Sequence, residues 1–301
     1  MPVPSFCHRG SFVSANALNS PRTGQELRRD ITGKIGWILC GAALLLVIGP
    51  LVDIVGVVTW NGIAAFSPHL FTENTTGPNG GLANAIEGTF LITFFAMLIA
   101  IPLGVGAGIH LSEYGRGKFA SATRFMSDTL TGTPSIVLGY FSYIVMIIGF
   151  GWGFSLMAAS ITIAILIVPY LARITELSLQ QVPNPMREAA YALGAKDSTV
   201  VFRVVLPAAS SGVMTGALLA LAISVGETAP LIYTAGWSNY SWNGQFTHEP
   251  VAYLTYVIWT FIDQPDAKSH ALAFAAAFLV MLVVLAINIG VRLTVRRKKF
   301  G

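Results

Sequence analysis

Six apolar stretches, each twenty or more residues long, dominate this sequence, and none of them carries more than one charged residue. The hydrocarbon core of a bilayer is about 30 Å thick, so a helix needs about 20 mostly apolar residues to cross it. Each stretch is long enough for one crossing. We therefore expect an all-α membrane protein with six transmembrane helices, at residues 35–59, 85–111, 127–149, 153–172, 207–229 and 270–291.

The composition supports this expectation. Only 11% of the 301 residues are charged, whereas soluble globular proteins have about 25%. The hydrophobic share is 54%, and the mean hydropathy is +0.66. This is too little charge to cover the surface of a soluble protein, which excludes a soluble enzyme, a disordered chain and a nucleic-acid-binding protein despite the pI near 9.1. Within the second stretch, Gly104 and Gly108 fit a close contact between two helices.

Lysine and arginine near the ends of the crossings predict the orientation, because short loops rich in them stay in the cytoplasm. They gather in the N-terminal tail, in the loops after the second and fourth stretches, and in the C-terminal tail. The long outer loop has only Lys268, and the two other loops have none. This alternation predicts a multi-pass protein of the plasma or inner membrane with both termini in the cytoplasm.

These patterns also predict the organisation of the chain. We expect a flexible cytoplasmic tail at 1–33, a transmembrane domain at 34–294 and a basic cytoplasmic tail at 295–301. Within the transmembrane domain, the most informative loops are a cytoplasmic one at 183–207 and an outer one at 230–269. The aromatic stretch 251–262 is too short to cross a bilayer and is expected to lie at its interface.

The loop after the fourth stretch predicts two short helices. Asn184 can cap the first helix, with a proline at its first helical position, and Gly194 can end it in a left-handed conformation. Asp197 or Ser198 can cap a second helix that runs to Leu206. Read alone, this segment is equally compatible with an ordinary amphipathic connector on the membrane surface.

A spaced motif runs through the same loop: Glu-Ala-Ala, a glycine four residues later, and Leu-Pro twelve residues further on. This motif resembles the EAA loop of ABC importer permeases. Residues 131–139 and 226–231, together with Arg173 and Glu176, are similar to phosphate-importing permeases of the PstA type, and the resemblance covers roughly residues 80–290. It implies that contact with an ATPase involves Arg187, Glu188, Ala189, Ala190, Gly194, Ala195, Leu206 and Pro207.

The resemblance implies partners. They are ABC ATPase subunits docked on the loop, a homologous second permease of the PstC type, an external phosphate-binding protein and the lipid bilayer. An ATP-binding loop would read G-x-x-x-x-G-K-[ST], and residues 115–119 have the wrong spacing and a phenylalanine in place of the hydroxyl residue. We therefore expect a transport subunit that is not itself an enzyme, binds no cofactor or metal, and relies on ATP used by a partner.

Polar groups inside a membrane are costly and often functional. The hydroxyls near Pro134 can bond back to their own helix or donate to a passing anion. Arg173 and Glu176 can pair with each other, or Arg173 can attract an anion at the inner mouth of the path. Glu227 can be an interfacial carboxylate or a gate residue that pairs with a partner's cation. The candidates for the translocation path are Thr131, Thr133, Pro134, Ser135, Arg173, Glu176, Glu227 and Thr228.

The substrate has alternatives. Many phosphate-importing relatives are expected to have an arginine just before the Gly-Glu-Thr motif, where this chain has Ile223, Ser224 and Val225. Phosphate import is the leading hypothesis, and sulfate, molybdate or another small anion is the first alternative. An ion-driven secondary transporter is the second, although no clear repeat relates the two halves. A membrane scaffold or embedded enzyme is the third, although the five histidines show no metal-ligand spacing.

Overall fold

The computed structural model describes residues 24–298, and every regular element in that part of the chain is a helix. The chain divides into two units, one reaching to Val57 and the other starting at Val58. Most of the predicted tail 1–33 and the end of the predicted tail 295–301 lie outside the described residues.

Helix α1 (Gly24–Ala65) contains the first predicted crossing and continues beyond it at both ends. Its segment Thr32–Ala65 is long and apolar enough to cross a bilayer, and none of its most apolar window is buried. Pro50 lies inside the helix. An apolar helix exposed in this way suits contact with lipid or with another transmembrane helix.

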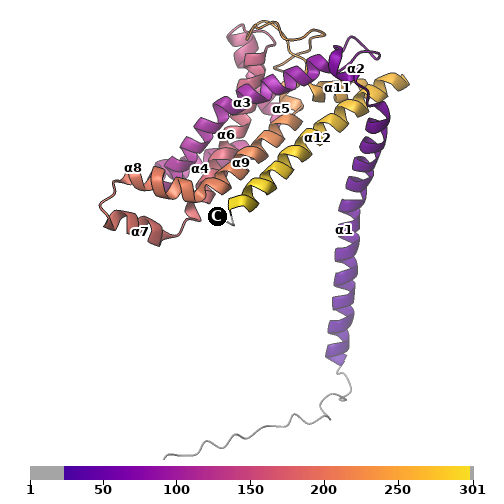
Figure 1. The fold of residues 1–301 in the computed structure, drawn as a ribbon. Helices are drawn as coiled ribbons and strands as arrows, with labels where there is room; N and C mark the ends of the chain where they lie inside the picture. The colour runs from indigo at the N-terminus through magenta and orange to yellow at the C-terminus, as the bar shows by residue number, and fades with distance from the viewer. Residues whose placement is uncertain (1–23, 299–301) are drawn as a thin grey trace, which may run out of the picture. The chain divides into compact units, whose positions relative to one another are not determined.

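The second unit is a bundle of helices with shorter helices at its two ends (Figure 1). The elements after α1 are α2 (His69–Thr72), α3 (Ala83–Ile109), a π-helical turn (His110–Tyr114), α4 (Gly117–Gly132), α5 (Ser135–Ser142), a π-helical turn (Tyr143–Gly149), α6 (Leu156–Gln180), α7 (Asn184–Ala192), α8 (Asp197–Val200), a π-helical turn (Val201–Val205), α9 (Leu206–Gly226), α10 (Ala229–Ile232), α11 (Leu254–Phe261) and α12 (Ala267–Lys298).

The described residues contain five helical segments long and apolar enough to cross a membrane, or six if the bent pair α4–α5 counts as one crossing. This agrees with the predicted number. Besides the segment in α1, the straight segments are Ala83–Tyr114, Leu156–Gln180, Asp197–Gly226 and Ala267–Leu293. Within the aromatic stretch 251–262, residues Leu254–Phe261 form the short helix α11, and its place at the membrane interface stays a prediction.

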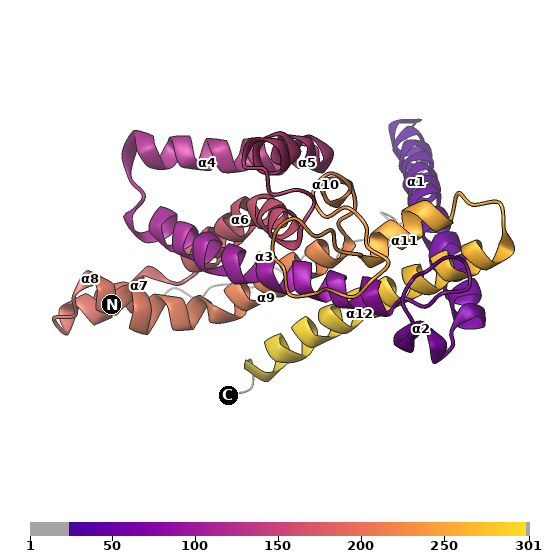
Figure 2. The same ribbon diagram turned by 90° about the horizontal axis from the view of Figure 1, so that it is seen from above.

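The third predicted crossing is wrong as a single helix that contains a proline. The chain bends by 99° between α4 and the helical segment that starts at Ser135 (Figure 2). Pro134 has no N–H group to donate, and its ring pushes the preceding residue out of the helical conformation. Thr133 accordingly has φ −77° and ψ 132°, which is extended backbone. Helix α4 also begins at Gly117, well before the predicted start.

The most extensive packing between helices in the second unit joins α3 to α6. A methyl group added at Gly104 would lie 2.6 Å from Cβ of Leu171, and one added at Gly108 would lie 2.5 Å from Cβ of Thr175. Only glycine permits this separation, so the predicted small-residue contact is confirmed. Fully buried apolar side chains such as Ile163 fill the space around the two helices, and α9 packs on the same core.

Candidate functional site

The predicted coupling loop, residues 183–207, lies at one end of the bundle and contains α7 and α8 (Figure 1). The predicted cap at Asn184 is wrong. Pro183 occupies the non-helical capping position with ψ 136°, and Asn184 is already helical. Pro185 is therefore the second helical residue, and Glu188 lies beyond the first turn. A proline fixes its own φ, which places the boundary one residue earlier than the preference of asparagine for caps suggests.

Gly194 ends α7 as predicted. Its φ is +77°, in the left-handed region. The Gly194 N–H donates to the Tyr191 carbonyl at 2.9 Å, and the Ala195 N–H donates to the Ala190 carbonyl at 3.1 Å. These two bonds form a Schellman motif, the common way to end a helix with glycine. No atom lies within 4 Å of an added methyl group, so the backbone conformation alone requires glycine here.

The predicted second helix does not end at Leu206. Helical structure runs on from Asp197 through α8, a wide π-helical turn and α9 to Gly226. Lys196 occupies the capping position, so neither Asp197 nor Ser198 caps the helix. A proline usually marks a helix end, but Pro207 is within the first turn of α9, directly after the wide turn. The wide turn interrupts the regular hydrogen bonding, so the missing N–H of Pro207 is tolerated there.

The predicted coupling residues divide into two groups by exposure. Glu188, Ala189, Gly194 and Pro207 are exposed, whereas Ala190, Ala195 and Leu206 pack against a buried apolar cluster around Val200 and Val205. The exposed apolar side chains beside the first group were not predicted. They are Met186, Tyr191, Leu193 and Phe202. The sequence signal for them is that an otherwise polar loop contains several large apolar residues.

Arg187 is the member of the predicted set that points away from the exposed surface. It is 17% exposed and forms an ion pair with Glu113, whose side chain is 11% exposed. Glu113 lies in the π-helical turn that follows α3, 74 residues earlier in the chain. Sequence reasoning missed Glu113, because the only local signal is a carboxylate just after an apolar stretch.

A second charged cluster joins α4 to α6, and it comprises Arg124, Arg173, Glu176 and Gln180. The Glu176 side chain is 1% exposed. It accepts hydrogen bonds from Arg124 Nε at 2.6 Å, from Arg173 Nη1 at 3.1 Å and from Gln180 Nε2 at 3.1 Å. Arg173 and Glu176 therefore pair one turn apart, which is one of the two predicted arrangements. Two arginines face one carboxylate, so the cluster keeps an excess positive charge.

Arg124 is the cluster member that the sequence did not predict. It comes from α4, 52 residues before Glu176, and it had counted only as an orientation charge. Its Nη2 also donates to the Leu111 carbonyl at 2.8 Å. The guanidinium thus connects α4 both to α6 and to the end of the crossing that contains α3. Its side chain is 32% exposed, compared with 43% for Arg173.

The hydroxyls of Thr131 and Thr133 bond to their own helix. Each donates to the carbonyl four residues earlier, Thr131 at 2.8 Å and Thr133 at 2.9 Å. This is the first of the two predicted arrangements, and it uses the one proton that each hydroxyl can donate. Ser135 differs, because its side chain lies beside the carboxylate of Glu227.

Two breaks in helices meet at Ser135 and Glu227. Helix α9 ends at Gly226, and Glu227 is extended with ψ 135°, so the predicted crossing 207–229 is wrong over its last three residues. The hydroxyl of Thr255 in α11 holds the Glu227 carbonyl at 2.8 Å. Thr228, the last of the predicted path residues, lies between α9 and α10, and its hydroxyl is 3.5 Å from the Gly226 carbonyl.

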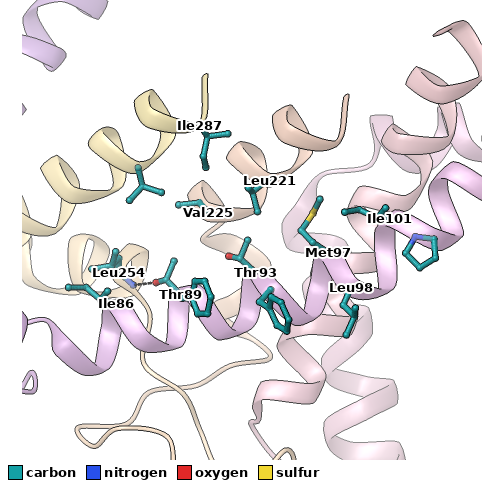
Figure 3. Close-up of a pocket in the computed structure, with 14 residues that line it drawn as sticks. Ile86, Thr89, Thr93, Met97, Leu98, Ile101, Leu221, Val225, Leu254 and Ile287 are labelled. Carbon is teal, nitrogen blue, oxygen red and sulfur yellow. Dashed lines mark hydrogen bonds between the residues drawn. The ribbon is translucent and has the colours of Figure 1, made fainter. Parts of the chain in front are cut away.

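A long apolar groove in the second unit does not suit an anion. It has a volume of about 790 Å³ and is lined by side chains of α3, α9, α11 and α12 (Figure 3). Nearly all of the lining is apolar, and the hydroxyl of Thr89 already accepts a hydrogen bond from the Leu254 N–H at 2.9 Å. Moving an anion onto such a surface costs desolvation free energy that the apolar lining does not offset. This groove therefore fits lipid or another apolar helix face.

Among the described residues, no group of three or more His, Cys, Asp or Glu side chains could hold a metal ion. The expectation that this chain binds no cofactor stays a prediction. The site residues described above form charged pairs, hydroxyl hydrogen bonds and helix breaks.

Comparisons with known proteins fit this geometry. Residues 100–300 match the family described as "Binding-protein-dependent transport system inner membrane component". The phosphate transport system permease protein PstA 2 of Mycobacterium bovis is 42% identical over 276 residues, which cover 91% of each chain. The phosphate transport system permease protein PstA of Yersinia pestis is 41% identical over 293 residues, covering 95% of this chain and 97% of the relative.

Solved structures agree at the level of the fold. The inward-facing MetNI methionine ABC transporter matches with a TM-score of 0.59 at 20% identity, and the match covers 72% of this chain and 95% of that one. An amino acid ABC transporter crystallised with histidines matches with a TM-score of 0.54, also at 20% identity, over 72% and 92% of the two chains. The chain therefore belongs to the family of binding-protein-dependent inner membrane transport components, and within it to the PstA-type permeases.

Proposed function

We propose that this chain is the membrane-spanning permease subunit of an ATP-driven importer of inorganic phosphate. The observation that carries the proposal is the exposed coupling loop at one end of a transmembrane bundle, in a chain that aligns over nearly its whole length with phosphate permeases. Membership of a binding-protein-dependent system implies an ATPase and an external binding protein as partners.

The ATPase docks on the coupling loop. Helix α7 has no buried residue, and it presents Glu188 and Ala189 together with the apolar side chains of Met186 and Leu193. A mixed surface of this kind, apolar in part and rimmed by charge, is typical of a protein interface rather than of a solvated loop. Binding and hydrolysis of ATP by the partner then move α7 relative to the membrane.

Phosphate passes between this chain and a second, homologous permease. One six-helix subunit encloses only half a path, so the second subunit completes it. In this chain the path follows the charged cluster at Arg173 and the paired helix breaks at Ser135 and Glu227. The excess positive charge of the cluster attracts an anion at the inner mouth. Glu227 repels an anion, so its role is gating through a cation of the partner.

The loop charges support an orientation with both termini in the cytoplasm. The outer loop 230–269 then faces the binding protein, and the coupling loop faces the ATPase. The lipid bilayer surrounds the apolar crossings, including α1.

The test begins with purification of the intact complex from native membranes and mass spectrometry of its subunits. We expect an ABC ATPase and a second permease to accompany this chain. Substitution of Glu188 by Ala and of Gly194 by Val is expected to weaken ATPase association and phosphate uptake. If both substitutions leave association and uptake intact, or if the chain purifies with no ATPase, the proposal fails.

A second candidate cargo is another small oxyanion such as sulfate or molybdate. The observation that favours it is the apolar and neutral run just before Gly226, where Ser224 is buried and its hydroxyl bonds to the Ala220 carbonyl at 2.9 Å. No cation there recognises the anion. Competition of labelled phosphate uptake by sulfate and molybdate decides between the two cargoes, since a phosphate importer resists both competitors.

A further inference from the structure

Helix α7 must transmit force, yet little of it is attached to the rest of the chain. None of its residues is buried, and it packs mainly against the following α8 and the π-helical turn after it, with Ala190 against the buried cluster around Val200. A displaced helix with such weak packing moves alone unless a specific contact ties it to the membrane-spanning helices. The ion pair between Arg187 and Glu113 is the contact that reaches α3.

The guanidinium of Arg187 is fully used within this chain. Its Nη2 donates to Glu113 Oε1 at 2.9 Å, and its Nε donates to Glu113 Oε2 at 3.3 Å. The same side chain donates to the Leu179 carbonyl at 2.9 Å, the Val182 carbonyl at 2.6 Å and the Asn184 side-chain oxygen at 3.5 Å. Five contacts match the five N–H groups that arginine has. Arg187 therefore has no donor left for a partner protein.

The pair has the geometry of a strong contact. Two parallel bonds between a guanidinium and a carboxylate fix both distance and orientation, which one bond between flexible chains does not. Both side chains are mostly buried, so water screens their attraction little. Ser112 donates a further bond to Glu113 Oε1 at 2.9 Å, which fixes the carboxylate from the other side.

The contact reaches a rigid part of the bundle. Glu113 follows α3 directly, and α3 fits against α6 through Gly104 and Gly108 at separations that leave no room for a methyl group. Close-packed helices of this kind move together rather than deform. The carbonyls of Leu179 and Val182 at the end of α6 bond to the same guanidinium. Movement of Arg187 therefore reaches both α3 and α6.

We propose that Glu113 is a positioning residue that couples movement of α7 to the α3–α6 pair through Arg187. This inference rests on the proposed function, because it needs an ATPase that moves α7. Without Glu113, the ATPase still docks on the exposed face of α7 and hydrolyses ATP, but less of the helix's movement is carried to α3, because only the bonds from Arg187 to the Leu179 and Val182 carbonyls remain.

The experiment measures phosphate uptake and ATP hydrolysis together in proteoliposomes that contain the complete importer and its binding protein. The variants are Glu113→Ala, which removes the carboxylate, and Glu113→Gln, which keeps the shape and one acceptor. The matched control is Glu73→Gln, because Glu73 also pairs one carboxylate with a basic side chain but is exposed. Co-purification of the ATPase checks that each variant assembles. The ratio of phosphate transported to ATP hydrolysed is measured on assembled complexes.

We expect Glu113→Ala to lower the phosphate transported per ATP hydrolysed by about tenfold, a typical size for a coupling between two sites. Glu113→Gln is expected to lower the ratio less, and Glu73→Gln to leave it unchanged. The inference is overturned if the ratio stays at the wild-type value in both Glu113 variants, whether or not the two activities fall together. A wild-type complex that has no ATP-driven uptake would instead refute the proposed function.

Discussion

The ion pair between Arg124 and Glu176 should stabilise the fold more than the neighbouring pair between Arg173 and Glu176. The perturbation is replacement of each residue by methionine, which has a similar length but no charge or donor. Singly and doubly substituted chains form two thermodynamic cycles that share Glu176, and each cycle isolates one pairwise free energy.

The magnitudes follow from distance and exposure. Two unit charges about 4 Å apart interact by about 4 kcal/mol at an effective dielectric constant of about 20, before any cost of desolvation. Arg124 is 32% exposed and its Nε lies 2.6 Å from a carboxylate that is 1% exposed. We expect a coupling free energy of about 2 kcal/mol, between the values for exposed and buried pairs.

Arg173 has the weaker geometry. It is 43% exposed, its single bond to Glu176 is 3.1 Å long, and it lies one helical turn away. Pairs of this kind contribute about 0.5 kcal/mol or less. We therefore expect Arg124 to have a coupling free energy with Glu176 that is well above that of Arg173.

The assay is denaturant unfolding of the purified chain in mixed micelles, followed by tryptophan fluorescence. The free energy of unfolding of each variant gives both cycles. Equal coupling energies, or a value for Arg124 below about 0.5 kcal/mol, would show that burial and distance do not govern this cluster.

Three further predictions concern stability, measured by the same unfolding assay. Gly194→Ala should lower the free energy of unfolding by about 1 kcal/mol because φ is +77°. Gly106→Ala is the matched control, since Gly106 lies inside a helix and its added methyl group also meets no atom within 4 Å; it should raise the free energy of unfolding by up to about 1 kcal/mol. Changes of the same sign in the two variants would contradict this. Gly108→Ala should cost about 1–3 kcal/mol, since the methyl group meets α6, and a neutral result would refute the tight packing. Ser269 donates to Asp266 through its hydroxyl and its N–H, and these bonds hold the pKa of Asp266 below its ordinary value of 3.8. The resulting stabilisation is present above that value and is lost as the pH falls through the lower folded pKa. The free energy of unfolding of Ser269→Ala should therefore lie below that of the wild type at neutral pH and approach it in acid. A difference that grows as the pH falls would contradict this.

Features set by neighbouring residues were predictable from the sequence. Gly194 ends its helix because a left-handed residue is needed one turn after Ala190, and both residues belong to the same short segment. Arg173 and Glu176 pair because residues three apart share a helix face. The six crossings follow from the length of apolar runs, which the bilayer thickness fixes.

Features that join distant segments were not predictable. Arg124 reaches Glu176 across 52 residues, and Glu113 reaches Arg187 across 74. No local pattern marks either partner, because the contact depends on how α3, α4 and α6 pack. Pro134 lies inside a predicted crossing, and the 99° bend found there accompanies the packing of α5 against α10. A methyl group added at Gly139 would lie 2.5 Å from Pro230 Cα, which shows how closely these two segments meet.

Prolines gave the least reliable signals for helix ends. Pro207 suggested an end at Leu206, and Pro183 moved a helix start that asparagine appeared to fix. Pro183 lies just before a first turn, where its missing N–H has no helical partner in any case. Pro207 lies inside a continuous helix, directly after the wide turn that interrupts the regular hydrogen bonding. A proline therefore marks a helix start as readily as an end, and only the surrounding backbone distinguishes the two.

The most direct test of the central claim is phosphate transport by the reconstituted complex. The complete importer, with this chain as one permease, is placed in liposomes with labelled phosphate and the binding protein outside and ATP inside. We expect uptake that requires ATP, that is lost with Gly194→Val, and that excess sulfate does not reduce. Uptake that proceeds without ATP, or that sulfate abolishes, would contradict the account of this chain as a subunit of an ATP-driven phosphate importer.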